Sequence, residues 1–259
     1  MTPLDLPVAL LVVLVVVAFV SGIGITTIGP GGIFVTIALF SLTPLSSAEV
    51  AGTAHLLFIA TGILGSAAYL RSGEMTSGPA RVMVLILCGS CIIGAIGGSV
   101  LNHHLEHSTF GALLGLVTIA VGVTMLYRQW RGLLAVCRLD VTTRGGQLFL
   151  ALVGVFLGLA SGLLGVGGPV LAVPTLVLLG VPMLLALAIA QVQSIIIATA
   201  AASGYLYYGS LSLAYAGFVG GPLLAGVLVG WLIAHRVEPN RLTQLLGIVM
   251  IVLGLLLLR

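Results

Sequence analysis

One ionisable side chain lies deep inside an apolar stretch of the chain. His55 stands about two helical turns into the stretch 47–70, and Glu49 lies near its start. An ionisable group among apolar residues is costly to bury and is therefore a candidate for function. His55 can bind an anion when protonated or can exchange a proton; the alternative is a neutral histidine bonded to a backbone carbonyl. Glu49 is expected to favour the dipole of its helix, with proton or sodium binding as the alternative.

The second half of the chain carries two amides at a corresponding place. Pairing Pro44 with Pro182 pairs His55 with Gln193, and Gln191 lies two residues earlier. Amide hydrogens can bind the oxygens of a ligand, or they can cap the carbonyl groups of a broken helix. Six hydroxyl groups are further candidates to line such a site, although each one alone is expected to bond within its own helix: Ser21, Thr26, Thr27, Thr53, Ser161 and Ser194.

Two glycine-rich breaks interrupt the apolar sequence, and each precedes a short apolar stretch, 31–42 or 168–179. Glycine disfavours helix because it loses the most backbone entropy. The helix after each break would present free N–H groups and a positive dipole end, which suits an anion. The alternative is close helix packing. The glycines predicted to contact the ligand are Gly31 and Gly32 in Gly29-Pro30-Gly31-Gly32, and Gly167 and Gly168 in Gly165-Val166-Gly167-Gly168.

The remaining motifs favour structural roles over chemistry. Cys88 and Cys91 have the spacing of a redox or metal pair, but they are expected to pack as small residues within a helix. The histidines of segment 103–107 are expected in a solvated loop. We therefore predict no metal site, no cofactor and no catalytic residue. Three small-residue pairs indicate tight helix packing, within the protomer or in a homo-oligomer: Gly94/Gly98, Gly154/Gly158 and Gly226/Gly230.

The elements that position these residues are predicted to be helices in a lipid bilayer. Of the 259 residues, 60% are hydrophobic and 6% are charged, whereas soluble proteins have roughly 25% charged residues. The net charge of +3 is too small and too scattered for nucleic acid binding. The apolar runs are continuous, unlike the alternating strands of a β-barrel. They predict an all-α, multi-pass protein of the cell (inner) membrane with eight spans: 5–28, 47–70, 80–101, 109–127, 146–164, 183–208, 211–234 and 242–258.

The chain is predicted to be an internal duplication. The glycine breaks recur, and Leu113-Leu114-Gly115 matches Leu245-Leu246-Gly247. Each half has about four spans plus one broken or half-length helix, and such duplication is common in secondary transporters. The expected divisions are a first transmembrane repeat over 1–130, a cytoplasmic linker over 131–144 and a second repeat over 145–259.

The orientation of the two repeats depends on the short stretches 31–42 and 168–179. If each one crosses the membrane, every half has five crossings and the halves are inverted. If each one re-enters, every half has four crossings and the halves are parallel. The distribution of arginines between the two sides favours inversion, by one residue.

The paired breaks resemble those of the TauE/SafE family of membrane transporters, also called sulfite exporters. The resemblance covers nearly the whole chain and is strongest over Ser161–Pro169, with Pro174 after it. The first half departs from it, because Ile33 and Ala38 stand where the second half has these two prolines. Equal contributions from the two half-sites are therefore not assumed. The resemblance implies transport of sulfite, sulfonates or related small organic anions.

These features predict a secondary transporter that moves a small anion by alternating access, with a midplane site between the repeats. No ATP-binding motif is present, so the driving force is expected from a proton or sodium gradient, the substrate gradient or a partner. His55 and Glu49 are the candidates for binding the coupling ion. The alternatives are an intramembrane enzyme, for which only His55 and the distant cysteine pair are available, and a passive anion channel.

Overall fold

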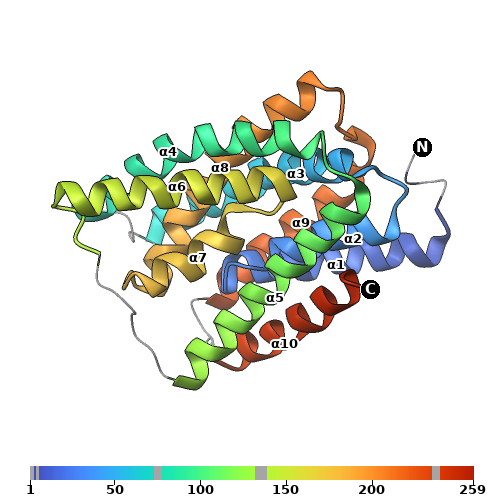
Figure 1. Ribbon diagram of the computed structural model, residues 1–259. Coiled ribbons are helices and arrows are strands. Elements are labelled where there is room, and N and C mark those ends of the chain that lie inside the picture. Colours follow the sequence, from blue (N-terminus) through green and yellow to red (C-terminus); the bar gives the residue numbers. More distant parts are fainter. Residues whose placement is uncertain (1–2, 4–5, 73–77, 132–138, 235–239) are drawn as a thin grey trace.

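The computed structural model describes residue 3 and residues 6–72, 78–131, 139–234 and 240–259. These residues form ten helices and no strand, which confirms the predicted all-α fold (Figure 1). Half of the predicted linker 131–144, residues 132–138, lies outside the described residues, as does Cys137. The helices are α1 Val8–Thr27, α2 Gly32–Leu42, α3 Ser47–Ser72, α4 Gly78–Asn102, α5 His107–Arg131, α6 Arg144–Leu164, α7 Gly168–Leu178, α8 Met183–Tyr207, α9 Leu213–Ala234 and α10 Asn240–Leu257.

Seven of the helices in the described part of the chain are long and apolar enough to cross a membrane. They are α1, α3, α4, α5, α6, α8 and α9, which correspond to the first seven predicted spans. The described apolar part of α10, Thr243–Leu257, is shorter. The two short stretches form α2 and α7, of 11 residues each. The protein is therefore a multi-pass α-helical membrane protein.

Glycines end the helices before both breaks. Gly29 has φ of 106° and Gly165 has φ of 61°, a backbone conformation that is unfavourable for side chains with a Cβ. The N–H of Gly165 donates to the carbonyl oxygen of Ser161 at 2.9 Å, so α6 ends in a left-handed cap. Pro169 then lies in the first turn of α7, where its missing N–H costs nothing. The breaks thus follow from local backbone chemistry.

Glycines line two helix–helix contacts, one between α4 and α6 and one between α1 and α9. Each contact joins a helix from the first half of the chain to one from the second half. A Cβ built on Gly158 would lie 2.9 Å from the carbonyl carbon of Cys91 and 3.0 Å from Ala95 N. A Cβ on Gly22 would lie 2.7 Å from Val227 N. These are backbone-to-backbone contacts, so the predicted tight packing of the small-residue pairs is confirmed within the protomer.

The helix pair α5 and α10 is antiparallel, and the two helices lie side by side in Figure 1. A Cβ on Gly115 would lie 2.8 Å from the oxygen of Gly254, and one on Gly122 would lie 2.8 Å from the oxygen of Gly247. Residue numbers therefore increase along α5 in the direction in which they decrease along α10. The sequence match pairs Gly115 with Gly247 and, at the same offset, Gly122 with Gly254. Exchanging the two matched segments therefore converts one of these contacts into the other.

The first three helices of each half are offset by 136 residues, since Gly32 begins α2 and Gly168 begins α7. The same offset relates the starts of α3 and α8, because the loops before them have equal length. This offset places His55 opposite Gln191, whereas the match of Pro44 with Pro182 places it opposite Gln193. The two prolines lie at different places in their loops. A loop tolerates proline wherever φ fits and no N–H is needed.

Candidate functional site

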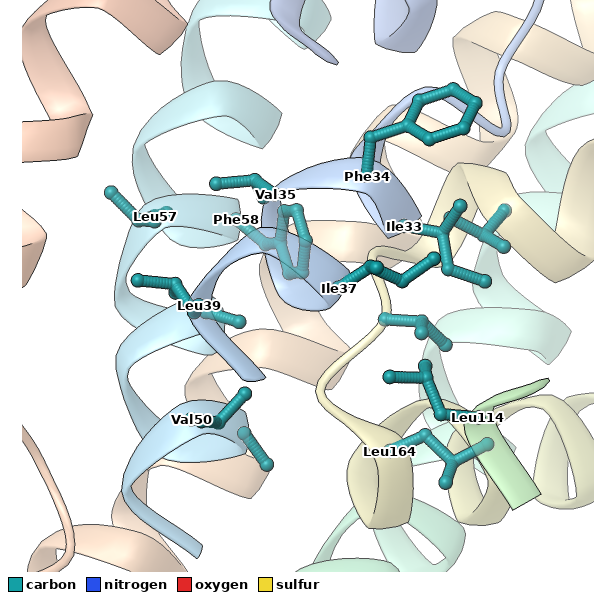
Figure 2. Close-up of a cluster of buried hydrophobic side chains, with 14 of the residues drawn as sticks. Ile33, Phe34, Val35, Ile37, Leu39, Val50, Leu57, Phe58, Leu114 and Leu164 are labelled. Carbon is teal, nitrogen blue, oxygen red and sulfur yellow. The ribbon is translucent and has the colours of Figure 1, made fainter. Parts of the chain in front are cut away.

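The N-terminal turns of α2 and α7 converge on one aromatic ring, that of Phe58 on α3. A Cβ on Gly32 would lie 3.0 Å from Phe58 Cε1, and a Cβ on Gly167 would lie 3.2 Å from Phe58 Cδ1. Figure 2 shows this ring reaching from α3 toward α2, within a cluster of buried hydrophobic side chains. Thr36 of α2 also donates to the carbonyl oxygen of Gly165 at 2.5 Å. The two predicted breaks are therefore brought together.

The N-terminus of α7 has an internal hydrogen-bond acceptor. The N–H of Gly168 donates to Ser194 Oγ of α8 at 3.3 Å. A Cβ on Gly168 would lie 2.9 Å from Ser194 Cα, so α7 and α8 touch through their backbones here. The 136-residue offset pairs Ser194 with Phe58. Phe58 thus lies against both breaks, whereas the hydroxyl group of Ser194 bonds the second one, and the two half-sites are unequal.

Gly31 serves the packing of α1 on α2. A Cβ on Gly31 would lie 2.5 Å from Gly24 Cα and 2.5 Å from Ile25 N. No side chain fits in that space, and the chain reverses direction there. For Gly31, the structure therefore shows the close backbone packing that was the alternative to ligand binding.

His55 is fully buried beside the end of α6. Its Nε2 lies 3.4 Å from the carbonyl oxygen of Gly162, which can only accept, so Nε2 carries the hydrogen. Its ring stacks against Tyr205 with centroids 5.9 Å apart and meets Phe58 edge-on at 6.4 Å. Its Nδ1 has no hydrogen-bond partner among the described residues. The carbonyl bond is the neutral-histidine alternative, and the second nitrogen is still available to a proton.

Gln191 caps the end of α1 in the same manner. Its Nε2 donates to the carbonyl oxygen of Ile25 at 3.3 Å, and its Oε1 has no partner among the described residues. His55 and Gln191 thus each bond the first helix of the opposite half. Two tyrosines add bonds within each half, Tyr69 to Thr26 O at 2.6 Å and Tyr205 to Gly162 O at 2.8 Å. These donors satisfy carbonyl groups that the breaks leave unpaired.

Gln193 and Glu49 lie away from the two breaks. The amide of Gln193 lies beside the thiol of Cys91 on α4. Glu49 forms a capping box with Ser46: its Oε2 accepts from the N–H of Ser46 at 2.9 Å and from its hydroxyl at 2.8 Å. The N–H of Glu49 is 3.3 Å from Ser46 Oγ. Glu49 therefore stabilises the start of α3, the role predicted for its position on the dipole.

The cysteine pair and the histidines of segment 103–107 make structural contacts. Cys91 Sγ donates to the carbonyl oxygen of Cys88 at 3.3 Å within α4. In the loop after α4, His103 stacks on Tyr208 at 4.3 Å. Across the described residues, no three side chains of His, Cys, Asp or Glu come close enough to hold a metal ion.

All seven predicted binding residues are buried in this conformation: Gly31, Gly32, His55, Gly167, Gly168, Gln191 and Gln193. A ligand therefore reaches these residues only after side chains or helices rearrange. Phe58 was missed at the sequence level, and Ser194 was only one of several hydroxyl candidates. The two glycine breaks match at an offset of 136 residues. Continuing the match at this offset into the following helices pairs Phe58 with Ser194 and would have found both.

Comparison with known proteins identifies a family. Residues 9–257 match the family described as Sulfite exporter TauE/SafE, which is almost the entire chain. No curated protein and no solved structure matches the chain significantly. The family consists of membrane transporters, in agreement with the multi-pass helical fold and the paired glycine breaks. The chain belongs to the TauE/SafE sulfite exporter family.

Proposed function

We propose that this protein is a secondary transporter that moves a small anion, sulfite or a sulfonate, by alternating access. The observation that carries the proposal is the convergence of the α2 and α7 N-termini on Phe58. Each N-terminus contributes a positive dipole end, which favours an anion near the centre of the protein without a buried arginine. The N–H of Gly168, bonded to Ser194 in this conformation, becomes a further donor when that bond opens. The family supports a sulfur oxyanion as the substrate.

The direct test is counterflow in proteoliposomes. Vesicles loaded with unlabelled sulfite are expected to accumulate labelled external sulfite transiently, and methanesulfonate is expected to compete. Saturation and trans-stimulation are the marks of a carrier. Flux that never saturates and shows no trans-stimulation would favour the passive anion channel and contradict the carrier mechanism. Chemical change of the recovered substrate would favour the intramembrane enzyme.

An inverted arrangement of the two repeats is part of this proposal. The corresponding helices α5 and α10 run antiparallel, as do α3 and α8, where Gly62 contacts Ile195 and Gly65 contacts Gln191. Helices related by a two-fold axis in the membrane plane have opposite directions, which supports inversion. Substrate entering from either side of the membrane then meets corresponding helices, although the residues that they carry differ.

Reporter fusions test the inversion. A reporter at the C-terminus is expected outside the cell, while one inserted in the linker 131–144 is expected in the cytoplasm. Inverted halves have an odd number of crossings each, which separates these two points. A C-terminal reporter on the same side as the linker would require parallel halves.

His55 is proposed to carry the coupling proton on Nδ1. Replacing it with glutamine keeps a donor for the oxygen of Gly162 but removes the site of protonation. If one proton moves with each substrate, wild-type uptake at a fixed internal pH is expected to change by up to about ten-fold per external pH unit. The His55→Gln variant is expected to lose this dependence.

His103→Gln is the matched control, because His103 is exposed and stacks on Tyr208 in a loop. It should keep the wild-type pH profile of uptake. A His55→Gln variant whose pH profile equals that of the wild type would remove His55 from the coupling role and leave it as a cap of α6.

A further inference from the structure

The ring of Phe58 occupies the place where the two half-helices meet. Three of its atoms lie within 3.4 Å of the Cβ position of Gly167, and two lie within 3.3 Å of that of Gly32. The ring is 1% exposed. A phenyl ring accepts no conventional hydrogen bond, so it fills this space as an apolar side chain only.

The equivalent residue of the second half has the opposite chemistry. Ser194 offers an oxygen to the N–H of Gly168 at 3.3 Å. The α7 end of the site thus has an oxygen acceptor in addition to the ring, whereas only carbon lies against the Cβ position of Gly32. An oxyanion that approaches Gly32 from the side of its Cβ position must displace the ring of Phe58, which lies 3.0 Å from that position.

A buried polar atom beside the ring points to a ligand at this place. His55 lies one helical turn before Phe58 and meets its ring edge-on, with centroids 6.4 Å apart and planes at 80°. Its Nδ1 has no hydrogen-bond partner among the described residues, although the side chain is fully buried. Burying an unpaired polar atom is unfavourable, so a partner in another state is expected. Because Nε2 carries the hydrogen, Nδ1 is an acceptor and can bind an oxyanion only after it has taken up the coupling proton.

We propose that Phe58 is the residue that limits the size of the anion, by filling the site in its empty state and moving aside for substrate. The inference rests on the proposed function. The space that the ring vacates is bounded by the two half-helices and by His55, so it suits a small oxyanion such as sulfite. Alkyl sulfonates are expected to be excluded progressively as their chains lengthen.

The test measures uptake of sulfite and of methane-, ethane- and propanesulfonate by wild type, Phe58→Leu and Phe58→Ala. Pockets commonly discriminate by about ten-fold or more per methylene at their size limit. The ratio of propanesulfonate to sulfite uptake is therefore expected to rise at least about ten-fold in both variants. Phe58→Leu preserves much of the buried volume and keeps the test valid if the alanine variant does not fold.

Leu57→Ala is the matched control. Leu57 is the neighbouring buried side chain of α3, and its Cδ2 lies 3.4 Å from the Cβ position of Gly220 on α9, away from the breaks. Its size profile should equal that of the wild type. If wild type moves sulfite but the Phe58 variants keep the wild-type ratio, the inference alone is overturned. If wild type moves none of the four anions, the proposed function fails as well.

Discussion

Replacing Gly168 with leucine is expected to reduce sulfite uptake by about ten-fold or more while the protein still inserts in the membrane. The added side chain begins 2.9 Å from Ser194 Cα and 3.0 Å from Ser194 N, so α7 must move away from α8. The hydrogen bond from Gly168 to Ser194 is then lost. Overpacking of this kind costs about 1–3 kcal/mol. If the conformation that moves substrate is disfavoured by a free energy of that size, uptake falls by about ten-fold or more.

Gly221→Leu is the control for this prediction, since nothing lies within 4 Å of the Cβ position of Gly221 on α9. Initial rates of sulfite uptake and thermal unfolding of the purified protein are measured for both variants. Gly168→Ala serves as the milder change, with a Cβ in the same tight space. Uptake by Gly168→Leu at the wild-type rate would show that the α7 terminus takes no part in the site.

Replacing Gly158 with leucine is expected to prevent accumulation of folded protein. Its Cβ would meet the backbone of Cys91 and Ala95 on α4, and these atoms cannot rotate away. Because a whole helix must move, we expect a loss of at least about 3 kcal/mol, the upper end of typical overpacking. The measurement is the yield of monodisperse protein after extraction, followed by its unfolding temperature.

Gly89→Leu on α4, the helix that packs against α6, is the matched control. The Cβ position of Gly89 has nothing within 4 Å, so its leucine only adds apolar surface on the outside of α4. Yield and unfolding temperature of this variant should equal those of the wild type. A Gly158→Leu protein with unchanged unfolding temperature would contradict the backbone contact between α4 and α6.

The membrane fold could be predicted from the sequence because its causes are local. Continuous apolar runs need no tertiary contact to be recognised, and glycine opposes helix wherever it stands. The bounds of α2 and α7 therefore agree with the predicted short stretches 31–42 and 168–179. Glycine pairs such as Gly154/Gly158 indicated tight packing for the same reason, since small residues permit close approach of any neighbouring helix.

The partners of these elements could not be predicted from the sequence. Helices α3 and α8 are apolar on all sides, so no hydrophobic stripe shows which face meets the breaks. That uncertainty allowed Gln193 to be placed with Gln191, although they are two residues apart and point to different neighbours. Nor could the sequence alone show that Glu49, a candidate for ion coupling, forms the capping box of α3 with Ser46.

By itself, the sequence determined that the chain is a helical membrane protein with two glycine breaks, because hydropathy and backbone propensity act within single segments. Only the tertiary structure decided that both breaks meet at Phe58 and that Ser194 takes the equivalent place in the second half. It also decided that His55 caps a carbonyl of α6 while one of its nitrogens stays without a partner in the described chain. These relations depend on which helix faces pack together, and packing joins residues more than a hundred positions apart.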